Sequence, residues 1–330
     1  MDISIIHYHS ILINKSRLYR LLFLILKLLI FFFSMYYIVI TLFEKKSFSD
    51  LNTLFYGLNY TSLFIVLVVL ILMFINWFIE SIKWRLLISK LQEISLFTSY
   101  KAVLTGLTVN TWIPNRLAEF IGRILYLEQG NRTKATFSTL VGGFAQLIIT
   151  TLIGSIGVIF WFISSKDLVY ITILLLIIDG FLLLAYFNVS LFSGIIKKIS
   201  FLKKLWQYAE ILEEYSSFQL MELLLLAFIR YSVYCTQYYL LFLAFGADFG
   251  LLNSLLCVSL IFFSLSVIPA VTLTEIGVRG ATVLYFTGFY TENTTGVLAA
   301  AYLIWLINII IPAIAGAFLL LRIKYPVKVE

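Results

Sequence analysis

Two distant stretches of the chain repeat one arrangement of residues that could bind an anion. In each stretch a proline interrupts an apolar run, a glutamate follows shortly, and an arginine stands four positions after the glutamate. These residues are Pro114, Glu119 and Arg123 in the first stretch, and Pro269, Glu275 and Arg279 in the second. Positions i and i+4 share one face of a helix, so each glutamate can pair with its arginine. Ionisable groups inside a membrane are costly and usually line a cavity or a pathway, so the repeated pairs favour transport.

Each proline is expected to end one helix and to let a second helix start near the middle of a membrane. Proline removes a backbone donor and clashes with the preceding turn. The unpaired N–H groups and the dipole at the start of the second helix favour an anion. Arg116 lies in that first turn and can offer a guanidinium fork to a phosphate. Asn110 and Asn115 flank the first break, where they either satisfy freed backbone groups or contact a bound headgroup.

Further polar residues stand in otherwise apolar segments. Gln146 is a candidate for the same site, and so is Arg230, because an isolated charge needs a partner or a wet cavity. Glu80 and Lys83 lie near the end of a predicted span, where long side chains are expected to snorkel toward water. The residues expected only to form hydrogen bonds between packed helices are Asp179, Gln237 and Asn308. The alternative for the two Glu–Arg pairs is that they merely neutralise each other so that burial is tolerated.

The composition indicates an all-α polytopic membrane protein. Of the 330 residues, 62% are hydrophobic and only 12% are charged, whereas soluble domains carry roughly 25% charged residues. Continuous apolar runs such as residues 63–75 need helices and exclude the alternating pattern of a transmembrane barrel. Cys235 and Cys257 fall in apolar segments and are expected to be packing residues, so we expect no metal and no cofactor. The net charge of +7 is distributed as membrane topology requires, which argues against a nucleic-acid partner.

The apolar segments predict six transmembrane helices plus two proline-broken re-entrant hairpins. The predicted spans are residues 21–43, 62–79, 137–163, 168–187, 221–245 and 297–321. The hairpins cover residues 97–129 and 251–289, and their charged return arms are short for full crossings, which need about 20 apolar residues. With a cytoplasmic N-terminus, all but five of the 24 lysines and arginines fall on or near the cytoplasmic side, and the C-terminus does too. A topology with ten full crossings would place these lysines and arginines on the same side equally well, so their distribution does not distinguish hairpins from full spans.

The two halves of the chain match as an inverted repeat within a single membrane domain, residues 1–330. Each half reads span, span, broken hairpin, span, and three spans reverse the orientation of the second half. Repeat one covers about residues 15–165 and repeat two about residues 166–325. Because transporters of this kind bind substrate where the repeats meet, Glu119 and Glu275 are expected to share a central cavity. The cytoplasmic joint, residues 190–218, is either a basic amphipathic helix on the inner leaflet or a solvated linker.

The residues around the two prolines resemble a known family. The first region reads Asn110-x-x-x-Pro114-x-Arg116-x-x-Glu119-x-x-x-Arg123, and the second reads Pro269-x-x-x-x-x-Glu275-x-Gly277-x-Arg279. This pattern is similar to that of the lysylphosphatidylglycerol synthase transmembrane region, also called the flippase-like domain family. Many members have glycine where this chain has Ala118 and Thr274, so its hairpin tips are expected to pack differently.

The resemblance implies a protein of the bacterial cytoplasmic (inner) membrane that moves an anionic lipid between leaflets. The lipid would be an aminoacyl-phospholipid or a polyprenyl-phosphate-linked sugar, and the expected partner is therefore a membrane lipid with an anionic headgroup. Fused members of the family carry an aminoacyl-transferase domain. A separate synthase or glycosyltransferase is accordingly a further possible partner, and the oligomeric state stays open.

Two other functions stay open beside lipid translocation. One is a secondary transporter of a small anion or ion, and the other is a membrane glycosyl- or lipid-modifying transferase or its accessory subunit. The sequence carries none of the common catalytic motifs, which favours a protein that is not an enzyme. A lipid path needs a groove that opens sideways to the bilayer, whereas a solute path needs a closed, wet cavity.

Overall fold

The computed structural model describes residues 25, 29, 32–33, 35–41, 59–112, 118–164, 166–188, 210–268 and 272–322. Within these ranges the chain is helical apart from short turns and contains no strand. The longer helices are α3 (Tyr60–Ile88), α4 (Leu96–Trp112), α5 (Ala118–Ile124), α6 (Arg132–Trp161), α7 (Leu168–Phe187), α10 (Ser217–Ala244), α11 (Leu251–Val267), α12 (Thr272–Thr287), α13 (Thr294–Trp305) and α14 (Ile311–Leu321). Three short turns are η1 (Gln129–Asn131), η2 (Glu210–Glu214) and η3 (Leu306–Ile310).

Five helical segments are long and apolar enough to cross a membrane, which confirms a polytopic membrane protein. They are Tyr60–Ile88, Gln129–Trp161, Leu168–Phe187, Ser217–Ala244 and Thr294–Leu321, and each overlaps one predicted span. The remaining predicted span, residues 21–43, lies mostly outside the described residues. Within it, residues 35–41 are described and are helical. Large apolar side chains such as Phe74, Leu176 and Phe318 are exposed on these helices, as a surface in contact with lipid requires.

Helices α4 and α5 pack together within the first predicted hairpin. A Cβ built on Gly122 would lie 2.6 Å from Gly106 Cα, and one built on Gly106 would lie 2.6 Å from the carbonyl oxygen of Glu119. The two backbones can approach this closely because glycine has no side chain. The residues between these helices, Pro114, Asn115 and Arg116 among them, lie outside the described ranges. The depth of the pair in the membrane stays a prediction.

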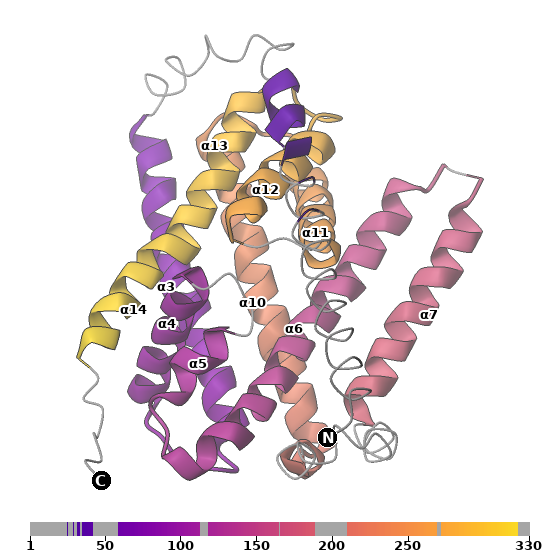
Figure 1. The fold of residues 1–330 in the computed structure, drawn as a ribbon. Helices are drawn as coiled ribbons and strands as arrows, with labels where there is room; N and C mark the ends of the chain where they lie inside the picture. Colours follow the sequence, from indigo (N-terminus) through magenta and orange to yellow (C-terminus); the bar gives the residue numbers. More distant parts are fainter. Residues whose placement is uncertain are drawn as a thin grey trace, which may run out of the picture.

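Helices α11 and α12 form the second pair, within the second predicted hairpin. The Cys257 thiol donates to the carbonyl oxygen of Phe286 at 3.4 Å and so links α11 to the end of α12. Pro269, between the two helices, lies outside the described residues. Figure 1 shows α11 and α12 in one half of the bundle and α4 and α5 in the other half, with α3, α6 and α10 running between the two ends.

The last span contains a wide turn that is explained by Pro312. Proline has no amide hydrogen to donate to the carbonyl oxygen of Asn308, four residues earlier. The helix widens there into the π-helical turn η3, and the Asn308 carbonyl oxygen accepts from Trp77 Nε1 at 3.1 Å. Beyond the turn, Gly316 packs against the backbone of Leu104 in α4. One span therefore contacts both α3 and the first helix pair.

The start of α10 is fixed by local chemistry. Ser216 and Gln219 form a capping box, in which each side chain bonds the backbone N–H of the other residue. The neighbouring Tyr215 hydroxyl donates to the carbonyl oxygen of Leu87 at 2.5 Å, and burial raises its pKa to about 12. Most of the predicted linker, residues 190–209 of 190–218, lies outside the described residues.

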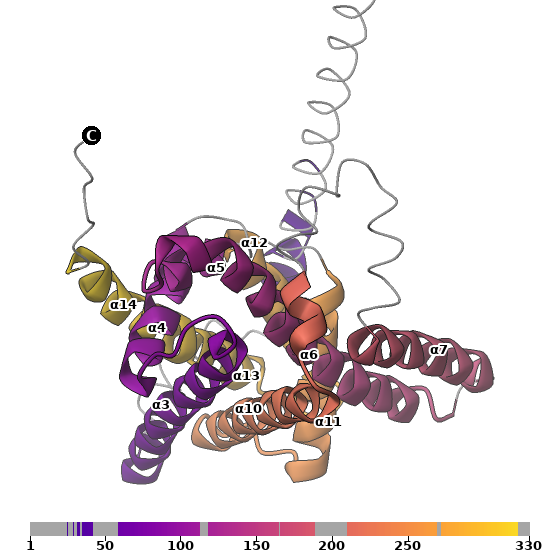
Figure 2. The ribbon, with the colours of Figure 1, turned by 90° about the horizontal axis from the view of Figure 1, so that it is seen from below.

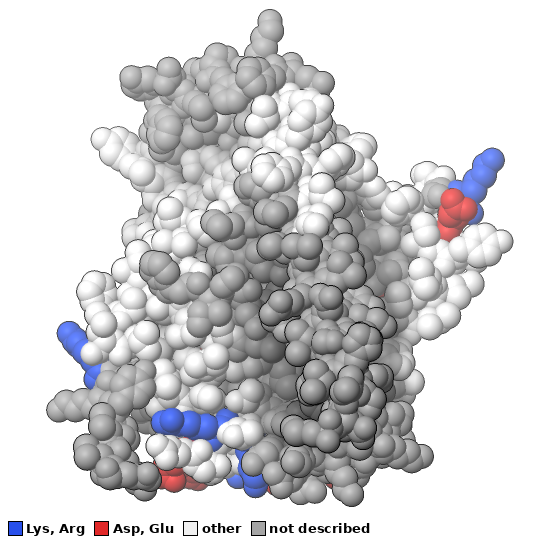
Figure 3. Space-filling view, in the orientation of Figure 1, with Lys and Arg blue, Asp and Glu red and all other residues white. Residues whose placement is uncertain are grey.

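Helix α7 lies at the edge of the bundle, where it packs mainly against α6 (Figure 2). Few of its side chains are buried, which fits a helix with one face on protein and the rest on lipid. In Figure 3, the visible lysines and arginines lie near one end of the bundle and at the turn between α6 and α7. Between these two places, the described residues on this face show no charge, as the core of a bilayer requires.

Candidate functional site

A polar cavity of about 390 Å³ lies where both helix pairs meet the long helices. Glu119 from α5 and Glu275 from α12 line it together, as the sequence predicted, while the inverted repeat itself stays a prediction. Its volume lies at the lower end of the range in which proteins bind small ligands, roughly 300–1,000 Å³. The other polar residues of the lining are Asn110, Gln146, Thr150, Arg230, Tyr231, Tyr234, Ser266, Arg279 and Asn308.

In the first pair, Arg123 is held between two carboxylates. Its Nη2 donates to Oε1 of Glu119 on the same helix and, at 3.0 Å, to Oε1 of Glu80 on α3. The Arg123 side chain is only 3% exposed, whereas that of Glu119 is 27% exposed. Arg123 is absent from the cavity lining. The first pair therefore presents its carboxylate to the cavity, with the arginine behind it.

In the second pair, Arg279 has one carboxylate and one neutral partner among the described residues. Its Nη2 donates to Oε1 of Glu275 at 2.5 Å, and its Nη1 donates to the Tyr238 hydroxyl at 3.2 Å. Both members of this pair line the cavity, although Arg279 is largely buried. The second pair therefore offers both a cation and an anion to a ligand.

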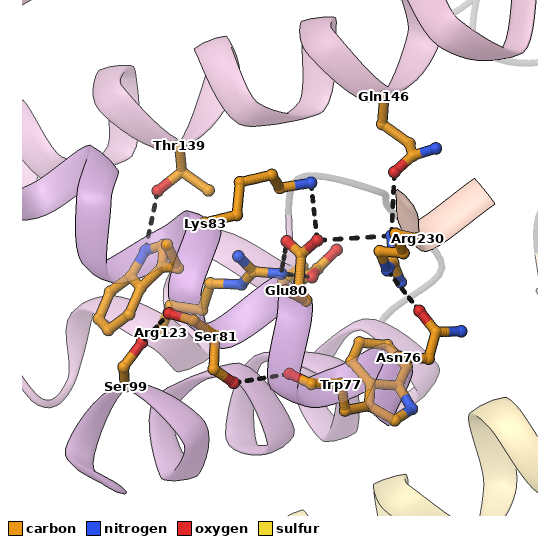
Figure 4. A network of polar contacts seen from close by, with 12 residues as sticks. Asn76, Trp77, Glu80, Ser81, Lys83, Ser99, Arg123, Thr139, Gln146 and Arg230 are labelled. Atoms are coloured by element: carbon orange, nitrogen blue, oxygen red, sulfur yellow. Dashed lines mark hydrogen bonds and ion pairs between the residues drawn. The ribbon is translucent and has the colours of Figure 1, made fainter. Parts of the chain in front are cut away.

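Glu80 is the centre of a buried charged network (Figure 4). Its Oε2 lies 2.7 Å from Lys83 Nζ and 3.4 Å from Nη1 of Arg230, while its Oε1 accepts from Arg123. The prediction that Glu80 and Lys83 snorkel to water is wrong, because they are only 5% and 2% exposed. Helix α3 continues to Ile88, well past the predicted end of the span at residue 79, and it packs against α4, α6 and α10. The sequence signal that could have identified this buried pair was an acid and a base at positions i and i+3 inside a long apolar helix.

Arg230 joins this network to the cavity. Its Nε donates to Oδ1 of Asn76 at 2.8 Å, and its Nη1 lies 3.5 Å from Oε1 of Gln146. The guanidinium also lies 5.1 Å from the centre of the Trp77 ring, within cation–π distance. The charge that looked isolated in the sequence thus has a carboxylate, two amides and two aromatic rings, Trp77 and Tyr234, as neighbours.

A chain of amides continues from Asn76 across three helices. Asn76 Nδ2 donates to Asn308 Oδ1 at 3.3 Å, and Asn308 Nδ2 donates to Gln237 Oε1 at 3.1 Å. Gln237 Nε2 in turn donates to the carbonyl oxygen of Val69 at 3.0 Å. The expectation that Gln237 and Asn308 bond packed helices is confirmed. This chain holds α3, α10 and the π turn together beside the cavity.

The ionisable groups around the cavity do not balance. Those described there are the carboxylates Glu80, Glu119 and Glu275 and the cations Lys83, Arg123, Arg230 and Arg279. Three negative charges against four positive charges leave one positive charge. A single anionic group would neutralise this set, whereas a cation would add to the imbalance.

The structure thus brings six of the predicted site residues to one cavity. They are Asn110, Glu119, Gln146, Arg230, Glu275 and Arg279. Four others, Pro114, Asn115, Arg116 and Pro269, lie outside the described residues. Sequence reasoning missed Asn76, Glu80, Tyr231 and Tyr234, and the two tyrosines carried no signal that separates them from other aromatic residues in the spans. Cys235 and Cys257 are buried and free, and the described residues contain no group of His, Cys, Asp and Glu that could hold a metal ion.

Comparison with known proteins gives one result. Residues 24–324 match the family described as the lysylphosphatidylglycerol synthase TM region. No curated protein and no solved structure gives a significant match. The matched range contains both helix pairs, the cavity between them and the buried network around Glu80. The chain therefore belongs to the family of the lysylphosphatidylglycerol synthase transmembrane region.

Proposed function

We propose that this protein is a flippase-like transporter that moves an anionic lipid from one leaflet to the other. The observation that carries the proposal is the shared cavity, where the glutamates of two Glu–Arg pairs, from two separate helix pairs, meet inside an apolar bundle. Charged groups at such a place are costly and are kept where they serve a pathway. The excess of one positive charge among the described ionisable groups around the cavity favours an anionic headgroup.

The arrangement of the two helix pairs supports translocation in particular. They lie in opposite halves of the bundle (Figure 1), and each contributes a glutamate to the cavity between them. In an inverted repeat, one such pair would open the cavity to one side of the membrane and the second pair to the other side. A headgroup would occupy the cavity while its acyl or prenyl chains stayed in the bilayer. The protein would make or break no covalent bond.

The charge distribution supports an orientation with both termini in the cytoplasm of a bacterial cell, where the inner membrane would be the site of action. Lysines and arginines are concentrated on one side in the predicted topology. The lipid would be a polyprenyl-phosphate derivative, or an aminoacyl-phospholipid whose phosphate is the anionic group beside the added ammonium. A separate glycosyltransferase or synthase would make it on that side.

A reconstituted system tests the proposal. Purified protein is placed in liposomes that carry a fluorescent phosphatidylglycerol or a fluorescent polyprenyl phosphate, and the fraction bleached by external dithionite is followed over time. We expect protein-dependent exchange between leaflets for at least one of these anionic lipids and slower exchange for fluorescent phosphatidylcholine, which carries no net charge. Equal rates for all three lipids, or no exchange for any, would contradict the proposal.

The same liposomes distinguish a solute transporter. Loaded with phosphate or chloride, they should release neither ion faster than protein-free liposomes do. Ion release without lipid exchange would instead assign the cavity to a small anion.

A further inference from the structure

We propose that Glu80 is a positioning residue, the permanent counter-ion of Arg123, and that it thereby allows Glu119 to leave Arg123 during translocation. The statement about translocation rests on the proposed function. The statement about the counter-ion rests on the geometry alone, because Arg123 Nη2 bonds both Glu80 and Glu119.

The first step of the argument is the burial of Arg123. A guanidinium that is 3% exposed cannot lose all of its carboxylate partners, because an unpaired buried charge is strongly destabilising. Arg123 has two carboxylate partners and can therefore release one of them. Arg279 has a single carboxylate partner among the described residues, so the second pair has no such freedom.

The second step decides which partner is released. Glu119 is 27% exposed and lines the cavity, so water or a ligand can solvate it when it turns away from Arg123. Glu80 is 5% exposed and is also bound by Lys83 at 2.7 Å. Lys83 in turn is held against α6, where a Cβ built on Gly142 would lie 3.5 Å from Lys83 Cε. Glu80 therefore stays in place, and Glu119 is the exchangeable carboxylate.

The third step excludes the simpler explanation that Glu80 serves only to neutralise Lys83. The two carboxylate oxygens are divided between partners: Oε2 faces Lys83 and Arg230, whereas Oε1 faces Arg123. The oxygen that holds Arg123 is thus not the one that holds Lys83. Because Arg123 lies on α5 and Glu80 on α3, the bond also keeps the first helix pair attached to a long span while Glu119 moves.

A double-mutant cycle on the full chain tests the counter-ion role without any transport assay. The background variant Glu80→Gln with Lys83→Met removes one negative and one positive charge, so the net charge is unchanged. In the wild type, Glu119→Gln should lower the melting temperature by only about 3 °C, because Glu80 still neutralises Arg123. In the background variant the same change should lower it by about 10 °C, because Arg123 then has no carboxylate. Glu275→Gln is the matched control and should cost the same in both backgrounds.

A rescue variant keeps the test decisive if a combination fails to fold. Adding Arg123→Met removes the uncompensated charge from the triple variant and should restore its folding. If the background variant itself unfolds, Arg230→Met is added to it, because Arg230 loses its Glu80 carboxylate there, and the cycle is run in that background. Equal effects of Glu119→Gln in both backgrounds, or no rescue by Arg123→Met, would overturn the counter-ion role, whatever lipid assays give.

Translocation is then measured in the folded background variant. Glu119 is there the only carboxylate partner of Arg123 and cannot leave it, so exchange of the fluorescent anionic lipid should fall about tenfold while the lipid still binds. Wild-type rates in that variant would overturn the role in translocation and leave the counter-ion role standing. If the wild type itself moves no lipid, the proposed function fails, and the melting temperatures still decide the counter-ion role.

Discussion

The two Glu–Arg pairs have the same spacing in the sequence and different surroundings in the structure. Arg123 is shared between Glu119 and Glu80 and lies behind the cavity wall. Arg279 bonds Glu275 and the neutral Tyr238 hydroxyl and lines the cavity itself. The comparison teaches that a repeated motif need not repeat a role: the first pair has a spare counter-ion, whereas the second pair has a cation within reach of a ligand.

The largest expected effect is a difference in unfolding free energy between variants of the two Glu–Arg pairs. Glu275→Gln removes the carboxylate partner of Arg279 and should lower the free energy of unfolding by about 3 kcal/mol, because a buried guanidinium is left without a charge partner. Glu119→Gln should cost about 1 kcal/mol, because Glu80 remains on Arg123. Chemical or thermal unfolding in one detergent measures both. Equal losses would show that the two pairs are energetically alike.

The second expected effect is on the rate of lipid exchange, and it tests whether the arginine of the second pair contacts the ligand. Arg279→Ala should slow the exchange of anionic lipid between leaflets by roughly 10- to 100-fold, as expected for the loss of one charge-assisted hydrogen bond. Arg322→Ala, at the exposed end of α14, removes the same charge far from the cavity and should leave the rate unchanged. The dithionite assay reports both variants. A comparable loss in the Arg322 variant would mean that the arginine acts through overall charge.

The third effect concerns the helix pairs that carry the motifs. Gly122→Ala should cost about 2 kcal/mol in unfolding free energy, since the new Cβ would lie 2.6 Å from backbone atoms of Thr105 and Gly106. Gly143→Ala in α6 meets nothing within 4 Å and should be neutral or slightly stabilising, as alanine favours helices. The pair α11–α12 is joined by the Cys257 thiol, and Cys257→Ala should cost less than Gly122→Ala. The reverse order would show that glycine contacts are not what holds the first pair.

The smallest expected effect tests the π turn beside the cavity. Trp77→Phe keeps the ring near Arg230 but removes the donor to the Asn308 carbonyl oxygen, so it should cost about 1 kcal/mol. Trp161→Phe, whose neighbours are the rings of Phe286 and Phe289, should cost less. Melting curves of the two variants suffice. A larger loss from the Trp161 variant would assign the wide turn to Pro312 alone.

The sequence predicted the parts of the structure that follow from local rules. Hydropathy located five spans, and the majority of their predicted ends lie within a few residues of the observed ends. The prolines marked where helices break. Both signals depend only on the residues close to each position. The i, i+4 spacing correctly paired Glu119 with Arg123 and Glu275 with Arg279. The end of α3 was placed too early, because most of residues 80–88, including the charged Glu80 and Lys83, are buried in protein.

The surroundings of the motifs could not be predicted, because they depend on residues far apart in the sequence. Nothing near Arg123 indicates that Glu80, 43 positions earlier, reaches it, and nothing near Arg279 indicates Tyr238. The bond from Asn308 to Asn76 joins positions 232 residues apart. Such contacts are set by how whole helices cross, which spacing along one helix does not reveal.

The π turn of the last span also limits which insertions and deletions this region tolerates. A π turn holds one residue more than the α-helical turn it replaces, so α14 is rotated by about 100° relative to a helix that continued regularly from α13. Removing one residue from 306–310 would take out the extra residue of the turn and would look harmless in a hydropathy plot. It would turn Gly316 away from Leu104 and place a bulkier neighbour against α4. In relatives of this chain, the length of this span between Asn308 and Gly316 should therefore vary less than that of the other spans.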